Sequence, residues 1–114
     1  MPNSIGRSFR NTSNYRTFDE FKEDYFREHP EEIDEFITII FEEYAKDGDI
    51  KALLASLRTV SRVKGITAIA EETGISRNGI QKALSENGNP YFESINAILH
   101  AIGFRLMPQR IQRG

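Results

Sequence analysis

Four polar side chains that can hydrogen-bond DNA gather on one face of a predicted short helix near the middle of the chain. They are Arg77, Asn78, Gln81 and Lys82, and at about 3.6 residues per turn these positions point to one side of a helix. Arginine, asparagine and glutamine can each form two hydrogen bonds with a base edge in the major groove, whereas lysine binds a phosphate as a point charge. The spacing therefore indicates a helix that reads DNA through Arg77, Asn78 and Gln81.

The surrounding stretch, Gly65 to Leu84, predicts two short helices joined by a tight turn. We expect Thr67 to cap the first helix and Ser76 the second, because an N-cap hydroxyl accepts a hydrogen bond from an otherwise unpaired N–H of the first turn. Gly74 favours the left-handed conformation with which a chain leaves a helix sharply. This combination is typical of a helix-turn-helix motif, whose second helix enters the major groove.

Further side chains around this motif are candidates for phosphate contacts, which fix the register on DNA without reading its sequence. They are Arg62, Lys64, Thr67, Ser76 and Lys82. The alternative is a helical corner that is buried on one side, solvated on the other, and binds nothing. Gly79 favours DNA binding, because a glycine inside a helix costs about 1 kcal/mol relative to alanine and a close approach to DNA would explain it.

Charge is distributed unevenly along the 114 residues, although the formal net charge is only −2. Residues 1–16 contain three arginines and no acid, residues 17–50 contain thirteen acidic and three basic side chains, and residues 51–114 contain nine basic and four acidic ones. The net charges are therefore +3, −10 and +5. The basic part contains the predicted DNA-reading helix, as attraction to phosphates requires, and the acidic part suggests a second kind of partner.

Apolar residues at helical spacing predict an all-α fold. Such stripes run through residues 33–44, 50–60 and 92–102, and a capping box from Thr17 to Glu20 opens a shorter aromatic helix. We expect a five-helix domain with a helix-turn-helix core and at most one short C-terminal strand, Phe104 to Met107. The expected divisions are a disordered tail over 1–16, an acidic helical extension over 17–48, a DNA-binding domain over 49–108 and a flexible tail over 109–114.

Stretches inside and beyond the motif carry a family resemblance. They are GDIKALLASLRTVSRVKGIT, AEETGISRNGIQKAL, S-x-N-G-N-P at Ser85 to Pro90, and AILHAIGFRL over 97–106. In them the chain resembles the HigA-type antitoxins, addiction-module antidote proteins with a helix-turn-helix of the lambda-repressor and Cro kind. The resemblance implies a dimeric DNA-binding protein that represses its own operon and neutralises a co-encoded, mRNA-cleaving toxin of the HigB/RelE kind. Ala68 departs from the family, because many members have a glutamine there that could touch the DNA backbone or a base.

Toxins of this kind bind RNA and are therefore basic, so the resemblance gives the acidic extension a partner. Aromatic side chains among the acids would supply the apolar anchors of such an interface. We expect the first helix, with little chain nearby to cover it, to bind the toxin through Phe18, Phe21, Tyr25 and Phe26. The alternative is that these aromatic side chains pack the N-terminal helices onto the core.

A homodimer is the expected assembly. One helix-turn-helix unit covers only about one half-site, and the palindromic operators of the family call for a two-fold dimer. The C-terminal helix and the segment after it carry more apolar surface than a small core readily hides. The predicted dimer interface therefore includes Ile95, Ile98, Leu99, Ile102, Phe104 and Leu106.

Other functional classes are disfavoured. Without cysteine the chain has no disulfide or thiolate metal site, and no apolar run is long enough to span a membrane, so we expect a cytoplasmic protein. His29 and His100 are too isolated for a metal site, no cofactor is expected, and no arrangement of catalytic residues favours an enzyme. The main alternative is a stand-alone, phage-like transcriptional regulator without a toxin. A neighbouring reading frame for a small basic protein would separate the two.

Overall fold

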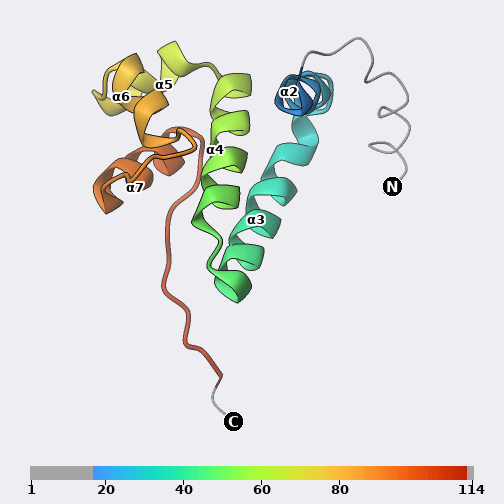
Figure 1. Ribbon diagram of the computed structural model, residues 1–114, viewed down its shortest axis with the longest axis vertical. Coiled ribbons are helices and arrows are strands. Elements are labelled where there is room, and N and C mark those ends of the chain that lie inside the picture. The colour runs from blue at the N-terminus through green and yellow to red at the C-terminus, as the bar shows by residue number, and fades with distance from the viewer. Residues whose placement is uncertain (1–16, 113–114) are drawn as a thin grey trace.

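The computed structural model describes residues 17–112 and is built from helices (Figure 1). The expected tail over 1–16 and the last two residues of the chain lie outside the described residues. Six α-helices follow one another, with a 3-10 helix after the first of them: α2 (Phe18–Glu28), η2 (Pro30–Glu32), α3 (Ile33–Asp47), α4 (Ile50–Lys64), α5 (Ile66–Thr73), α6 (Arg77–Ala83) and α7 (Phe92–Ala101). The all-α prediction is confirmed for this range. The predicted number of five helices is wrong, because the described range has six α-helices: the two expected N-terminal ones and four over 50–101.

The predicted strand over Phe104 to Met107 does not form. The N–H of Phe104 still donates to the Leu99 carbonyl, 2.8 Å away at the end of α7, and the chain beyond it is extended. Alternating apolar and polar residues make a strand only when a second strand is there to pair with. No second strand exists among residues 17–112, so the alternating pattern has no strand to pair with in this range.

Helix α4 lies at the centre of the molecule. Figure 1 shows α2 and α3 on one side of it and α5, α6 and α7 on the other, and α5 contacts α4, α6 and α7. The predicted stripe of α4 is buried at Leu53, Leu54, Leu57 and Val60. One continuous core contains side chains from all six α-helices, among them Phe26, Ile37, Leu57, Ile69, Ile80 and Ile98. The acidic helices therefore share a core with the basic part of the chain.

Local capping sets most helix boundaries as the sequence predicts. The Thr17 hydroxyl accepts a hydrogen bond from the N–H of Glu20 at 3.0 Å, and the carboxylate of Asp49 accepts one from Ala52 at 3.1 Å. Gly48 ends α3 in the left-handed conformation with a φ of 66°. No helix in the described part of the chain has both the length and the apolar character that crossing a membrane would require.

Candidate nucleic-acid interface

Helices α5 and α6 are joined by the three residues 74–76. Gly74 is left-handed with a φ of 79°, and the Ser76 hydroxyl caps α6 by accepting a hydrogen bond from the N–H of Gly79 at 2.9 Å. Ile69 of α5 and Ile80 of α6 are 3% and 0% exposed, so each helix is anchored in the core by its inner face. The outer face of α6 consequently points to solvent.

The structure brings together the four side chains that the sequence analysis placed on this outer face. Arg77, Asn78, Gln81 and Lys82 are all exposed. Ser76 and Thr67 are exposed beside them, as are Arg62 and Lys64 in the last turn of α4. The predicted outward placement of Arg77, Asn78, Gln81 and Lys82 agrees with the structure, and DNA contact by any of these residues stays a prediction.

Arg77 and Thr67 connect the starts of the two helices, because a guanidinium nitrogen of Arg77 donates a hydrogen bond to the Thr67 hydroxyl. The prediction that Thr67 caps α5 is wrong, since the N-cap is Gly65 and no side chain caps this helix. Gly65 has a φ of 106°, and the chain is already helical at Ile66. Thr67 therefore lies inside the first turn, where its hydroxyl is available to Arg77.

The glycine at position 79 has a steric explanation that does not involve DNA. A β-carbon at this position would lie 2.9 Å from Cγ2 of Ile75 and 3.1 Å from the hydroxyl oxygen of Ser76. Even alanine would crowd the connection between α5 and α6 and the group that caps α6. The sequence-based argument that only an approach to DNA explains this glycine is therefore wrong.

Two ion pairs that were not expected from the sequence connect α2 and α4. The Arg62 guanidinium donates to the Glu23 carboxylate at 3.1 Å, and Arg58 lies 3.9 Å from the Asp19 carboxylate. Arg58 also donates a hydrogen bond to the carbonyl oxygen of Leu84, directly after α6. The signal in the sequence is that two acids four residues apart on one helix match two arginines four residues apart on another. Arg62 is thus already paired with Glu23 of α2. A DNA phosphate would have to compete with this carboxylate for the contact predicted for Arg62.

The aromatic side chains expected to bind a toxin are mostly buried. Phe21, Tyr25 and Phe26 are 3%, 5% and 4% exposed, whereas Phe18 is 56% exposed. The expectation that little chain lies nearby to cover them is wrong, because α2 packs against α4 and the ring of Phe26 meets that of Phe36 with centroids 4.7 Å apart. The alternative interpretation, packing onto the core, holds for Tyr25 and Phe26, which belong to the core cluster.

The predicted dimer residues divide in the same way. Ile98, Leu99 and Ile102 are at most 6% exposed, so they fill the core of one chain and are not available to a second copy. The expectation that a small core cannot hide them is wrong, because the N-terminal helices enlarge that core. The other three predicted dimer residues are half-buried: Ile95, Phe104 and Leu106.

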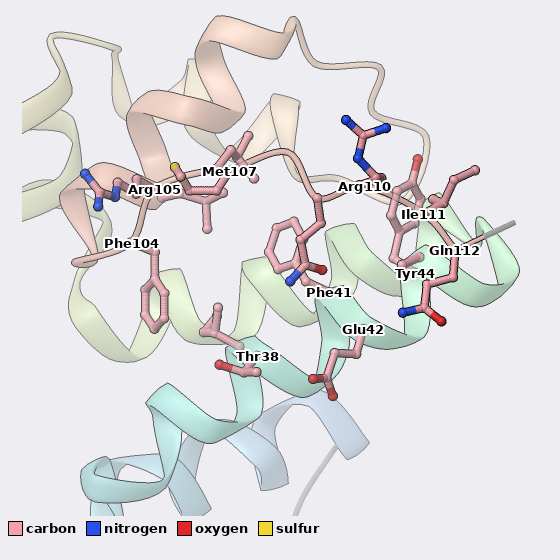
Figure 2. Close-up of a pocket in the computed structure, with 15 residues that line it drawn as sticks. Thr38, Phe41, Glu42, Tyr44, Phe104, Arg105, Met107, Arg110, Ile111 and Gln112 are labelled. Atoms are coloured by element: carbon pink, nitrogen blue, oxygen red, sulfur yellow. The ribbon is translucent and has the colours of Figure 1, made fainter.

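A groove of about 770 Å³ runs between α3 and the C-terminal segment (Figure 2). Thr38, Phe41 and Tyr44 line it from α3, and side chains of the extended segment over 104–112 line it from the other side. Met107 and Ile111 of this segment are 68% and 64% exposed. The surface around the groove is thus the place where apolar side chains of the C-terminal segment meet solvent.

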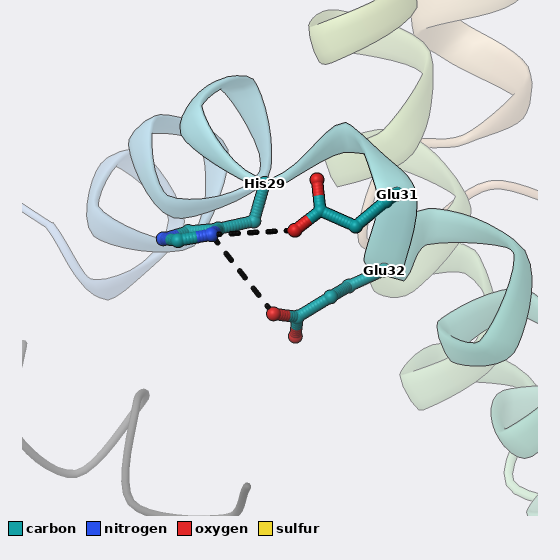
Figure 3. Close-up of side chains that lie close together, drawn as sticks. All are labelled: His29, Glu31 and Glu32. Atoms are coloured by element: carbon teal, nitrogen blue, oxygen red, sulfur yellow. Dashed lines mark ion pairs between the residues drawn. The ribbon is translucent and has the colours of Figure 1, made fainter.

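His29 is less isolated than the sequence suggests. Its Nδ1 lies 3.6 Å from the Glu31 carboxylate and 4.0 Å from that of Glu32 (Figure 3). The Tyr25 hydroxyl donates to both Glu32 oxygens at 2.9 Å, and the Tyr25 and His29 rings lie 4.5 Å apart. The prediction of isolation is wrong because the turn at η2 brings these side chains together. These side chains form a partly exposed cluster, and its contacts hold the η2 turn against the end of α2.

The fold and this surface define a small helical protein that presents a short polar helix on a shared core. The chain belongs to the family described as probable addiction module antidote proteins, which its residues 16–110 match. It is 31% identical over 77 residues to an uncharacterised protein of Haemophilus influenzae, an alignment that covers 68% of this chain and 79% of the relative. No solved structure matches the chain. An antidote in this sense is the antitoxin of a toxin–antitoxin module, a class of proteins that are typically not enzymes.

Proposed function

We propose that the chain is a DNA-binding antitoxin that represses its own operon and neutralises a toxin of the HigB/RelE kind. The observation that carries the DNA-binding part is the pair α5 and α6, anchored by Ile69 and Ile80, with the exposed Arg77, Asn78, Gln81 and Lys82 on the outer face. In this proposal the pair is a helix-turn-helix of the lambda-repressor kind and α6 is its recognition helix.

Arg77 and Lys82 are expected to act differently on DNA. Arg77→Ala should lower the preference for operator over random DNA by roughly ten- to a hundredfold, because one bidentate base contact discriminates by about 1–3 kcal/mol. Lys82→Ala should weaken binding to all sequences alike and reduce the slope of log affinity against log salt by about one phosphate. Binding isotherms on both DNAs over a series of salt concentrations measure both effects.

Lys51→Ala is the charge-matched control, since it removes one positive charge from an exposed position in the first turn of α4, at the other end of that helix from Arg62 and Lys64, and does not line the groove. It should affect operator and random DNA equally and only slightly. If Arg77→Ala loses as much affinity for random DNA as for operator DNA, the role of Arg77 in reading bases is wrong.

The acidic surface of α2 and α3 supports a basic protein partner. Thirteen acids fall within residues 17–50, and Asp34, Glu35, Glu42 and Glu43 are exposed on α3. Of the four aromatic residues first considered, Phe18 is the exposed one and remains in this proposed interface. Membership of an antidote family implies a toxin, and a basic surface that binds RNA is complementary to these charges.

Co-expression with the product of the neighbouring reading frame tests the partner. We expect a small basic protein that co-purifies with this chain and stops growth when expressed without it. If no neighbour does both, the stand-alone regulator without a toxin becomes the better account, and the predictions for Arg77 and Lys82 are unaffected.

A homodimer is proposed through the C-terminal segment and the groove beside α3. Within residues 17–112 the backbone from Arg105 onward makes no hydrogen bond to other backbone groups, so an equivalent segment of a second copy can pair with it. Met107 and Ile111 would then be covered. We expect the chain to sediment as a dimer at micromolar concentration and Met107→Asp to make it monomeric.

Phe92→Asp is the control for the dimer, because Phe92 is 74% exposed on α7 and does not line the groove. It should leave the sedimentation coefficient unchanged. A wild-type monomer at micromolar concentration would contradict the dimer, and equal effects of the two variants would place the interface elsewhere.

A further inference from the structure

Arg58 of α4 stands between the first helix and the end of the proposed recognition helix. One nitrogen of its guanidinium donates a hydrogen bond to the Leu84 carbonyl, and another lies 3.9 Å from the Asp19 carboxylate of α2. The Arg58 side chain is 18% exposed and that of Asp19 is 42% exposed, so the guanidinium is mostly covered while its acidic partner faces solvent. A single side chain thus touches two elements that are 65 positions apart in the sequence, Asp19 and Leu84.

Helix α6 depends on contacts of this kind at its ends. It has seven residues, which is far below the length at which an isolated helix is stable in water. Ser76 caps its N-terminus, and the Leu84 carbonyl just beyond its C-terminus is among the carbonyls that have no partner within the helix. A cation at this end also interacts favourably with the helix dipole. Arg58 therefore helps to fix where the last turn of α6 lies.

On its other side, α4 is paired with acidic side chains of α2 through Arg58 and Arg62. Asp19 pairs with Arg58, and Glu23, whose side chain is 11% exposed, pairs with Arg62 one turn further along α4. A basic partner that binds α2 would compete for the Asp19 carboxylate, which is the exposed one of the two. The position of Arg58, and with it the end of α6, would then depend on what occupies α2.

We infer that Arg58 is a positioning residue that couples the acidic face of α2 to the C-terminal end of α6. This inference rests on the proposed function, since it makes DNA reading respond to the occupant of α2. Two sites that bias one element affect each other reciprocally, so a partner that releases Arg58 lowers operator selectivity and operator binding weakens that partner's hold on α2.

Two pairs of variants of the full chain test the coupling. Arg58→Met keeps the apolar stem but removes both contacts. Arg27→Met is its control, because the ion pairs of Arg27 with described residues are with Glu23 and Asp24 of its own helix. Asp19→Asn removes the contact of Arg58 with α2 and also the ion pair of Asp19 with Lys22, and it leaves the Leu84 contact. Asp24→Asn is its charge-matched control, because it too removes an ion pair within α2. Arg58→Lys, which retains a donor for Leu84, tests rescue.

Amide hydrogen exchange of α6 provides a readout that needs no DNA. We expect Asp19→Asn to speed exchange in α6 several-fold, although Asp19 does not touch that helix, while Asp24→Asn leaves it unchanged. Arg58→Met should speed it more, and Arg58→Lys should restore part of the protection. Binding of operator and random DNA gives the second readout: Arg58→Met should lower selectivity roughly tenfold. The salt slope should stay unchanged, since Arg58 contacts a carbonyl and not a phosphate.

Equal exchange of α6 in Asp19→Asn and Asp24→Asn would overturn the coupling, as would equal selectivity of Arg58→Met and Arg27→Met. Failure of the wild-type chain to prefer its operator would instead overturn the proposed function, and the exchange data would still decide on the coupling. If Arg58→Met does not fold, Asp19→Asn and Arg58→Lys carry the test against the same controls.

Discussion

Replacement of Phe26 by alanine is expected to lower the free energy of unfolding by about 3–5 kcal/mol, the usual cost of removing a buried aromatic ring from a core. Phe26 is 4% exposed, and its ring packs against Phe36 of α3 within the core cluster that includes α4. Domains of this size are stable by only about 5–15 kcal/mol, so this one change removes a large part of the margin. Denaturant unfolding followed by circular dichroism measures the loss.

Phe18→Ala is the matched control on the same helix, because Phe18 is 56% exposed. Its effect on stability should stay within about 0.5 kcal/mol, as for most surface changes. Equal losses for the two variants would mean that α2 is not packed as described. Deleting residues 1–29 would remove Phe21, Tyr25 and Phe26 together, so it should unfold the protein and cannot separate partner binding from folding.

Gly88→Ala is expected to destabilise the protein by about 1–3 kcal/mol through overpacking and to weaken operator binding with it. A β-carbon at Gly88 would lie 2.4 Å from the Ala83 carbonyl oxygen and 2.9 Å from that of Lys82. Both atoms are backbone at the end of α6, so neither can move aside by rotating a side chain. The loop from Ser85 to Pro90 would have to shift away from α6.

Asn87→Ala is the control for the loop, since Asn87 is exposed next to Gly88. It should change the unfolding free energy by less than about 0.5 kcal/mol. Thermal or denaturant unfolding of both variants, together with operator binding, makes the comparison. A Gly88→Ala protein as stable as the wild type would show that the close approach of the loop to α6 is not needed.

The features that could be predicted from the sequence are local. Asp49 and Ser76 cap helices, and Gly48 and Gly74 end them, because a hydroxyl, a carboxylate or a left-handed glycine acts on backbone groups within about one turn. Helical spacing also predicts that Ile80 points inward and that Arg77 and Gln81 point outward, since one face of a short helix has to be buried.

What covers each apolar face was decided by the tertiary structure. Phe18 and Phe26 lie on one aromatic helix, yet Phe18 is 56% exposed while Phe26 is 4% exposed against Phe36 of α3. In the same way, Ile98 is buried while Met107 is exposed. An apolar stripe indicates that one face of a helix has to be covered. It does not identify the element that covers this face. The strand-like pattern at Phe104 to Met107 has the same limit, because a strand forms only beside another strand.

The contacts between α2, α4 and α6 were likewise decided by the fold. Arg58 is 26 positions from Leu84, and Arg62 is 39 positions from Glu23. Charge spacing along a helix shows which side chains share a face, and both rows of charges are visible in the sequence. Which row faces which depends on how the core packs, and only the packing of α2 on α4 makes Arg58 a link to the end of α6.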